Sequence, residues 1–314
     1  MGETHSAHTH LVPTTQRPLV SIGVPVRNGA AFLEEALQLL VEQTHDNIEI
    51  IVSDNASNDG SGDIIERFAN DDSRIKLFKQ LHTLTAFENF RFVFERASGD
   101  YFMWAACDDR RSLDNVQRLL AAIQAHPEAS LAFGDVAEFS DFTQWQSAVP
   151  MSYPFETRPN ESKYERLRRY TRINCLHIYG LIRRDALQSY EWLDIDNGPD
   201  IPLLVHLAFI GEFVRAEGGC FYYHAPPVAK SLEERAVANS LRRLRPLPEA
   251  RLAWACALAA HRAARQKGSR VPLFVAFALA YWNRHWRWLK PWLFPLVPGI
   301  LINVYRKRIK RAAV

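Results

Sequence analysis

Two adjacent aspartates, Asp108 and Asp109, follow an apolar run at 101–106. A carboxylate beside a buried strand needs a partner, and a divalent cation is the commonest strong partner. Ligands of open α/β sheets also bind outside the carboxyl ends of the strands, which is where this pair is expected to lie. The pair therefore predicts a cation site, although either aspartate could instead cap the helix that follows.

Apolar runs alternate with segments of helical periodicity between residues 19 and 136. This alternation predicts a mostly parallel, doubly wound, Rossmann-like sheet with helices on both faces. Asn28, Asp54 and Asp108 each follow one of the runs, so the loops at the carboxyl ends of the strands should bring them to one rim. Convergence of polar groups at one edge is typical of a binding site. The expected strands in this region are 19–26, 48–53, 75–79, 101–106 and 130–136.

The pattern loosens after about residue 140. We expect a long loop at 141–163, because this stretch is polar and contains proline. The residues that follow mix short strand-like and helical segments, and the later part is rich in Arg and Ala. The expected helices are 161–173, 201–210 and 232–268, and the expected strands are 178–182, 213–217 and 221–224.

The bulk composition is that of a globular protein of one large domain or two modest ones, with 314 residues and 47% hydrophobic residues. A net charge of +3 is too small to indicate a nucleic-acid partner. The four cysteines have no CxxC or metal-binding spacing, so we expect them to be reduced. Residues 1–17 are polar and contain no apolar stretch, which predicts a disordered tail and no secretion.

Residues 271–314 differ in composition from the rest of the chain. Two short apolar runs, 271–282 and 293–304, are interleaved with Trp, Arg and Lys, and five basic residues lie within 306–314. Neither run reaches the about 18–20 residues that span a bilayer. We therefore expect peripheral contact with the inner, cytoplasmic face of the plasma membrane, whose anionic lipids attract a basic tail. A helical hairpin packed on the main domain, or an oligomer contact, is the alternative.

Three motifs, in order and with plausible gaps, resemble glycosyltransferase family 2, whose members have the GT-A fold. They match the family's first strand and turn, its second strand with an acidic turn, and its metal-binding strand end. The motifs are VSIGVPVRN at 20–28, IIVSDNASNDGS at 50–61 and ASGDYFMWAACDD at 97–109.

The resemblance also divides the chain. It implies a GT-A domain at 18–235, with a nucleotide half at 18–136 and an acceptor half at 137–235, where the match is looser. It leaves 236–314 unexplained as a C-terminal helical extension.

The activity that the resemblance implies is transfer of a sugar from a nucleotide-diphosphate donor to a hydroxyl acceptor, with inversion at the anomeric carbon. Pro25, Asn28 and Asp54 would then line the nucleotide site, where the Asp54 carboxylate accepts a hydrogen bond from the base. Asp108, helped by Asp109, would hold Mg²⁺ or Mn²⁺, which neutralises the leaving diphosphate as a Lewis acid.

Asp200 matches the position of the family's acceptor-side acid, just ahead of the apolar helix expected at 201–210. The resemblance implies that it acts as the general base that takes the acceptor proton, and the helix dipole would keep it ionised. An aspartate ahead of a helix is also an ordinary N-cap, and Asp194 and Asp196 are rivals for the role. Asp54 could likewise be a turn residue.

The chain departs from the family pattern at two positions. Ala106 stands where the first Asp of the Asp-x-Asp motif is expected, so strict metal dependence is left open. Arg27 replaces an aromatic residue that often lies between Pro25 and Asn28, so base stacking is not expected there.

Other polar residues could also contact a substrate. His177 and His224 could touch the acceptor or the diphosphate, and Arg183 and Arg184 could meet the phosphate of a lipid-linked acceptor. Structural roles are the alternative for all four.

The resemblance implies synthesis of a cell-surface polysaccharide or glycolipid on a glycan or lipid-linked acceptor. Ala106 favours a second possibility, a nucleotide-binding or scaffold protein on the GT-A fold that has lost catalysis. A dinucleotide-dependent oxidoreductase is disfavoured, because the first turn lacks Gly-x-Gly-x-x-Gly. A nucleotidyltransferase on a related fold stays open, although the first loop is poor in the Gly, Arg and Lys that such enzymes use.

Overall fold

The computed structural model describes residues 17–151, 156–158, 160–170, 175–193, 195, 198–225 and 248–281. Asp194, Asp196, the expected tail before residue 17 and the basic segment after residue 281 lie outside the described residues, so those expectations are not addressed by it.

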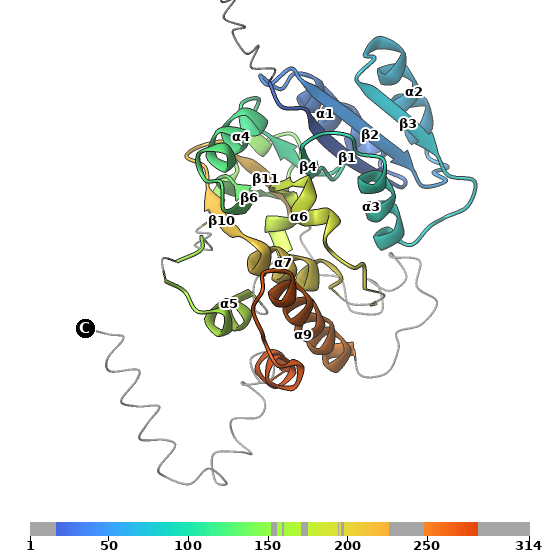
Figure 1. Cartoon of the computed structure of the whole chain (residues 1–314). Helices are drawn as coiled ribbons and strands as arrows, with labels where there is room; N and C mark the ends of the chain where they lie inside the picture. Colours follow the sequence, from blue (N-terminus) through green and yellow to red (C-terminus); the bar gives the residue numbers. More distant parts are fainter. Residues whose placement is uncertain are drawn as a thin grey trace, which may run out of the picture.

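The main sheet has seven strands in the order β10-β6-β9-β4-β1-β2-β3. All neighbouring strands are parallel except β9, which runs antiparallel to both β4 and β6. The prediction of a doubly wound, mostly parallel sheet is therefore confirmed (Figure 1). The strands are β1 (Val20–Val26), β2 (Ile48–Asp54), β3 (Ile75–Lys79), β4 (Tyr101–Trp104), β6 (Ala129–Phe133), β9 (Leu181–Arg183) and β10 (Glu212–Arg215).

Helices cover both faces of this sheet. Successive side chains of a strand point to opposite faces, and in β2 the side chains on both faces are apolar, so each face needs a covering layer. Ile50 and Val52 belong to one core, with α1 (Ala30–Val41), α2 (Ser61–Asp71) and α4 (Asn115–Ala125). Ile51 belongs to the other core. The second core also contains residues of α3 (Ala86–Glu95), α5 (Lys163–Tyr170), α6 (Arg184–Gln188), α7 (Asp200–Ile210) and α9 (Pro248–Gln266).

A second, four-stranded sheet has the order β5-β11-β7-β8. It combines β5 (Arg110–Arg111), β7 (Val136–Phe139), β8 (Val149–Met151) and β11 (Phe221–His224). The single strand expected at 130–136 is wrong, because the chain leaves the main sheet after β6 and enters this sheet as β7. A Cβ on Gly134 would lie 2.0 Å from the Gly219 carbonyl oxygen, so another backbone segment crosses at the break.

Two further expectations are corrected. The stretch 141–163 is not one long loop, because it contains a 3-10 turn at Trp145–Ser147, β8 and the start of α5. The strand expected at 178–182 begins only at Leu181, after a 3-10 helix at Cys175–Tyr179. A Cβ on Gly180 would lie 2.5 Å from the Ala132 carbonyl oxygen, so the chain bends there beside β6.

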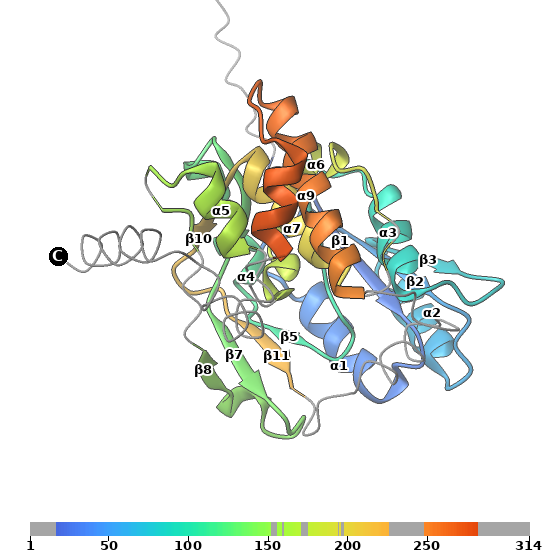
Figure 2. The ribbon, with the colours of Figure 1, turned by 90° about the horizontal axis from the view of Figure 1, so that it is seen from below.

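The helix α9 falls within the helical region expected at 232–268, and a further helix follows at 273–281. Both views place α9 alongside α7 (Figures 1 and 2). None of the helices described here combines the length and apolar character needed to cross a bilayer.

Candidate active site

The carboxyl ends of β1 and β2 are joined through Ser57. The Asn28 backbone N–H donates to the Ser57 Oγ at 2.9 Å, and the Ser57 N–H donates to the Asp54 Oδ1 at 3.1 Å. Asn28 has a φ of 51°, a left-handed conformation that asparagine tolerates better than most residues. Pro25 pairs in register with the β2 residue that precedes Asp54. Pro25, Asn28 and Asp54 therefore lie together at one rim, as expected.

The loop after β4 lies against the same rim. A Cβ on Gly29 would be only 2.7 Å from the Cys107 Sγ, so the turns after β1 and β4 pack directly on one another. Burial, with the neighbouring charges of Asp108 and Asp109, raises the pKa of the Cys107 thiol to about 12. Cys107 is thus a neutral packing residue, and it brings Asp108 next to the turn after β1.

Asp108 and Asp109 lie in different surroundings. The Asp108 side chain is 46% exposed, and its Oδ2 lies 3.7 Å from the His224 Nδ1. Asp109 is only 6% exposed, and its Oδ1 accepts a 2.9 Å hydrogen bond from the His224 backbone N–H. Burial, and then the charge of Asp108, raises the pKa of Asp109 to about 8. The exposed carboxylate faces solvent, whereas the buried one joins the β4 loop to β11.

Buried arginines support this loop. Arg111 donates to the Trp104 carbonyl oxygen at 2.6 Å and to the Tyr179 carbonyl oxygen at 3.1 Å. Burial lowers the pKa of Arg111 to about 10. Arg110 donates from Nε to the Glu35 Oε2 at 2.9 Å, which attaches β5 to α1. These contacts fix the backbone on both sides of the aspartate pair.

An aromatic cluster holds the His224 ring beside Asp108. The Phe142 and His224 ring centroids are 4.4 Å apart, and those of Phe139 and His224 are 5.5 Å apart. Phe32 of α1 stacks on Phe142 at 4.3 Å. The sequence offered His224 only as one of several histidines, because its proximity to Asp108 depends on pairing between distant strands.

Asp200 lies on α7, which contacts the 3-10 helix that ends at Tyr179. It is the first residue of α7, and the N-cap position is occupied by Pro199, which makes no side-chain cap hydrogen bond, so Asp200 is not the N-cap residue. Burial raises the pKa of Tyr179, and the charges of Asp109, Asp108 and Asp200 raise it further. The aspartate pair and Asp200 therefore lie within electrostatic range of one buried tyrosine. The sequence did not single out Tyr179.

Comparison with known proteins decides the family. The family model described as glycosyl transferase family 2 matches residues 21–191, more than half of the chain. The chain belongs to glycosyltransferase family 2.

Relatives of this glycosyltransferase include the putative teichuronic acid biosynthesis glycosyltransferase TuaG of Bacillus subtilis. It is 27% identical over 189 residues, which cover 60% of this chain and 71% of TuaG. Other curated relatives are matched over between 17% and 41% of their length.

Solved structures share the fold. TarS 1-349 of S. aureus in complex with UDP-GlcNAc superposes with a TM-score of 0.61 at 13% identity, covering 88% of this chain and 75% of that chain. The mannosyltransferase PcManGT from Pyrobaculum calidifontis, in complex with GDP-Man and Mn²⁺, gives 0.50 at 17% identity, covering 89% and 86%. The fold of this family 2 glycosyltransferase is thus GT-A.

The donor set of this glycosyltransferase fits a cation held mainly by the substrate. In the part of the chain that the structure describes, no group of three or more His, Cys, Asp or Glu side chains is arranged to bind a metal. Mg²⁺ commonly takes only one or two carboxylates and completes its shell with phosphates and water. The half-exposed Asp108 suits that arrangement.

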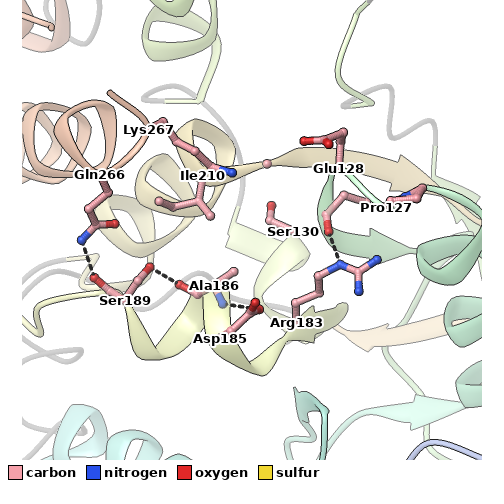
Figure 3. Close-up of a pocket in the computed structure, with 12 residues that line it drawn as sticks. Pro127, Glu128, Ser130, Arg183, Asp185, Ala186, Ser189, Ile210, Gln266 and Lys267 are labelled. Atoms are coloured by element: carbon pink, nitrogen blue, oxygen red, sulfur yellow. Dashed lines mark hydrogen bonds between the residues drawn. The ribbon is translucent and has the colours of Figure 1, made fainter. Parts of the chain in front are cut away.

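Two other candidates from the sequence do not present an accessible group at this rim. His177 is buried in ring contact with Phe133 at 4.6 Å, and burial lowers its pKa to about 3, so it is a neutral core residue. Arg183 donates to the Ala129 carbonyl oxygen at 2.7 Å, at the amino end of β6. Figure 3 shows Arg183 lining a cavity of about 420 Å³ at this opposite edge, with Ser189 and Gln266.

Proposed function

We propose that this glycosyltransferase transfers a sugar, with inversion, from a nucleotide-diphosphate donor to a hydroxyl of a glycan or lipid-linked acceptor in surface polysaccharide or glycolipid synthesis. The observation that carries the proposal is the exposed carboxylate of Asp108, on a loop that packs against the turn after β1, next to the rim of Asn28 and Asp54. Similarity to a putative teichuronic acid biosynthesis glycosyltransferase, and to structures in complex with UDP-GlcNAc and GDP-Man, supports the substrate class.

The nucleotide would lie against the loops after β1 and β2. Asp54 is 6% exposed overall, and one of its oxygens is used by Ser57, which fixes the carboxylate for a hydrogen bond from the base. Pro25 and Asn28 form the adjoining wall. This rim orients the donor so that its diphosphate points toward the β4 loop.

Asp108 would hold Mg²⁺ or Mn²⁺, which when bound neutralises the charge of the departing diphosphate. Asp109 is buried and accepts a hydrogen bond from the His224 N–H of β11, so it positions the loop that carries Asp108 and the His224 ring. Asp200 accepts the proton of the acceptor hydroxyl, because its place at the start of α7 favours the ionised carboxylate.

The domain limits and the location are also part of the proposal. We assign the transferase to 18–235, with a nucleotide half at 18–136 and an acceptor half at 137–235. The extension 236–314 then brings the enzyme to the inner, cytoplasmic face of the plasma membrane through 271–314.

The test is release of nucleoside diphosphate from a panel of UDP- and GDP-sugars with Mn²⁺ and candidate acceptors. Asp108→Asn and Asp200→Asn should lose turnover, whereas Asp63→Asn, on the exposed side of α2, should keep it. Normal turnover by Asp200→Asn would remove the base assignment.

Ala106 favours the second candidate, a nucleotide-binding protein without catalysis. Calorimetric binding of UDP or GDP with no turnover across the donor and acceptor panel would establish that function instead.

A further inference from the structure

The hairpin formed by α9 and helix 273–281 exposes a row of large apolar side chains. Phe274 is 80% exposed, Trp254 47% and Val275 39%. The Trp254 and Phe277 rings are 5.7 Å apart, and Phe277 stacks on Tyr281 at the same distance. We call these five residues the hairpin surface. Contiguous apolar side chains on a protein surface mark an interaction site.

The hairpin is fixed to the body of the protein. Buried alanines of α9 pack in the core that α7 shares, and the Gln266 Nε2 donates to the Ser189 carbonyl oxygen at 3.0 Å. The His261 Nδ1 lies 2.7 Å from the Val271 carbonyl oxygen, which ties the second helix to α9. The exposed row is therefore presented by a packed element.

Exposed basic side chains flank the hairpin surface, and the exposed Glu191 beside it is paired with Arg262 of α9 at 2.7 Å. Residues 250–314 contain 13 Lys and Arg and no Asp or Glu. Among the described residues of this region, Arg265 at the end of α9 and Lys267 and Arg270 in the connection to Phe274 are exposed. Aromatic and basic side chains beside one another are the composition of elements that lie in the headgroup region of anionic membranes.

We propose that the hairpin surface docks on an anionic lipid bilayer, with Trp254 and Phe274 entering the headgroup region and these three basic side chains contacting lipid phosphates. The proposal rests on the membrane contact in the proposed function and deepens it by assigning the face and the class of lipid. A second copy of the chain fits less well, because a symmetric contact would bring two patches of the same positive charge together.

The orientation of α9 relative to α7 determines which part of the protein faces the bilayer when the hairpin surface docks. A Cβ on Gly198, just before α7, would lie 3.5 Å from the Cδ2 of Leu252, near the start of α9. Ile210 at the end of α7 and Gln266 at the end of α9 line the same cavity. The two helices therefore run in the same direction. Trp254 follows Leu252 by two residues, in the half of α9 that packs beside the start of α7, so docking brings the helix that begins at Asp200 close to the bilayer.

The experiment is sedimentation of the full chain with phosphatidylcholine vesicles, with and without phosphatidylglycerol. We expect binding to the anionic vesicles that weakens with salt. The double variant Trp254→Ser, Phe274→Ser should bind at least about tenfold more weakly. Neutralising Arg265, Lys267 and Arg270 to Gln should cost up to about fivefold for each residue. Leu81→Ser is the matched control, because Leu81 is 90% exposed between β3 and α3.

Three results would overturn the docking proposal. They are failure of the full chain to bind anionic vesicles, equal binding by the double variant, and a dimer in light scattering that the double variant dissociates. Thermal melting and nucleoside diphosphate release are measured on every variant. Turnover without vesicle binding refutes the docking alone, and vesicle binding by a protein that never turns over refutes the sugar transfer alone.

Discussion

Replacing Asp109 by Ala and by Asn separates a positioning role from a direct role in cation binding. Ala removes the acceptor of the 2.9 Å hydrogen bond from the His224 N–H, in a site where Asp109 is 6% exposed. A buried donor left without a partner costs about 1–3 kcal/mol, which is a factor of about 5 to 150 in the folding equilibrium. Asn keeps an oxygen at the same position.

Urea unfolding of the metal-free protein measures the free energy of unfolding, and calorimetry with UDP or GDP and Mn²⁺ measures the affinity for nucleotide. We expect Asp109→Ala to lose about 1–3 kcal/mol of unfolding free energy and to bind nucleotide several-fold more weakly, because His224 and the loop that carries Asp108 are no longer joined. Asp109→Asn should stay close to the native protein in both measurements. Burial raises the pKa of Asp109 to about 8, so its neutral form predominates at pH 7 and resembles the amide.

Asp108→Asn is the matched control for these variants. Its side chain is 46% exposed, so stability should be unchanged while the Mn²⁺-dependent part of nucleotide binding is lost. If Asp109→Asn abolishes Mn²⁺-dependent binding as fully as Asp108→Asn, then Asp109 is itself a ligand and the positioning role is refuted.

Three other predictions concern stability, catalysis and cation affinity. Burial opposes ionisation of Glu49, but hydrogen bonds from Lys76, Ser21 and Ser98 lower its pKa from 4.5 to about 2. The stability that Glu49 contributes is complete above pH 4.5 and is lost as the pH falls toward 2, so Glu49→Gln should cost roughly 2–3 kcal/mol at pH 7 and flatten the acid limb of urea unfolding. Asp200→Asn should lower kcat by at least about 100-fold with little change in donor KM, measured as nucleoside diphosphate release. Ala106→Asp, which supplies the missing first carboxylate, should lower the Mn²⁺ concentration needed for half-maximal nucleotide binding, and an unchanged requirement would contradict the location of the site.

Much of the nucleotide half was predictable because its strands are locally specified. The runs that form β1, β2 and β3 are apolar and end in turn residues, so their limits differ from expectation by at most a residue. Asn28 and Asp54 follow directly, since parallel strands carry their last residues to the same edge. The resemblance to the family then implied the roles that we propose for them.

Other features depend on contacts that no local pattern contains. The break between β6 and β7 arises because the Gly219 carbonyl, far along the chain, crosses beside Gly134. The contrast between Asp108 and Asp109 is equally non-local, because it arises from the His224 N–H of β11. Neighbours in sequence therefore acquired different surroundings that composition and spacing could not distinguish.

The pairing of β5 with β11 has a consequence for how the enzyme matures on the ribosome. β5 ends at Arg111 and its partner begins at Phe221, so the edge that carries the aspartate pair has no neighbour until the second half of the chain has emerged. A nascent polypeptide that stops before Phe221 can assemble β1, β2 and β3, yet the edge beside Asp108 and Asp109 lacks the strand that completes it. Prematurely terminated products should therefore be inactive even when they contain Asn28, Asp54 and Asp108.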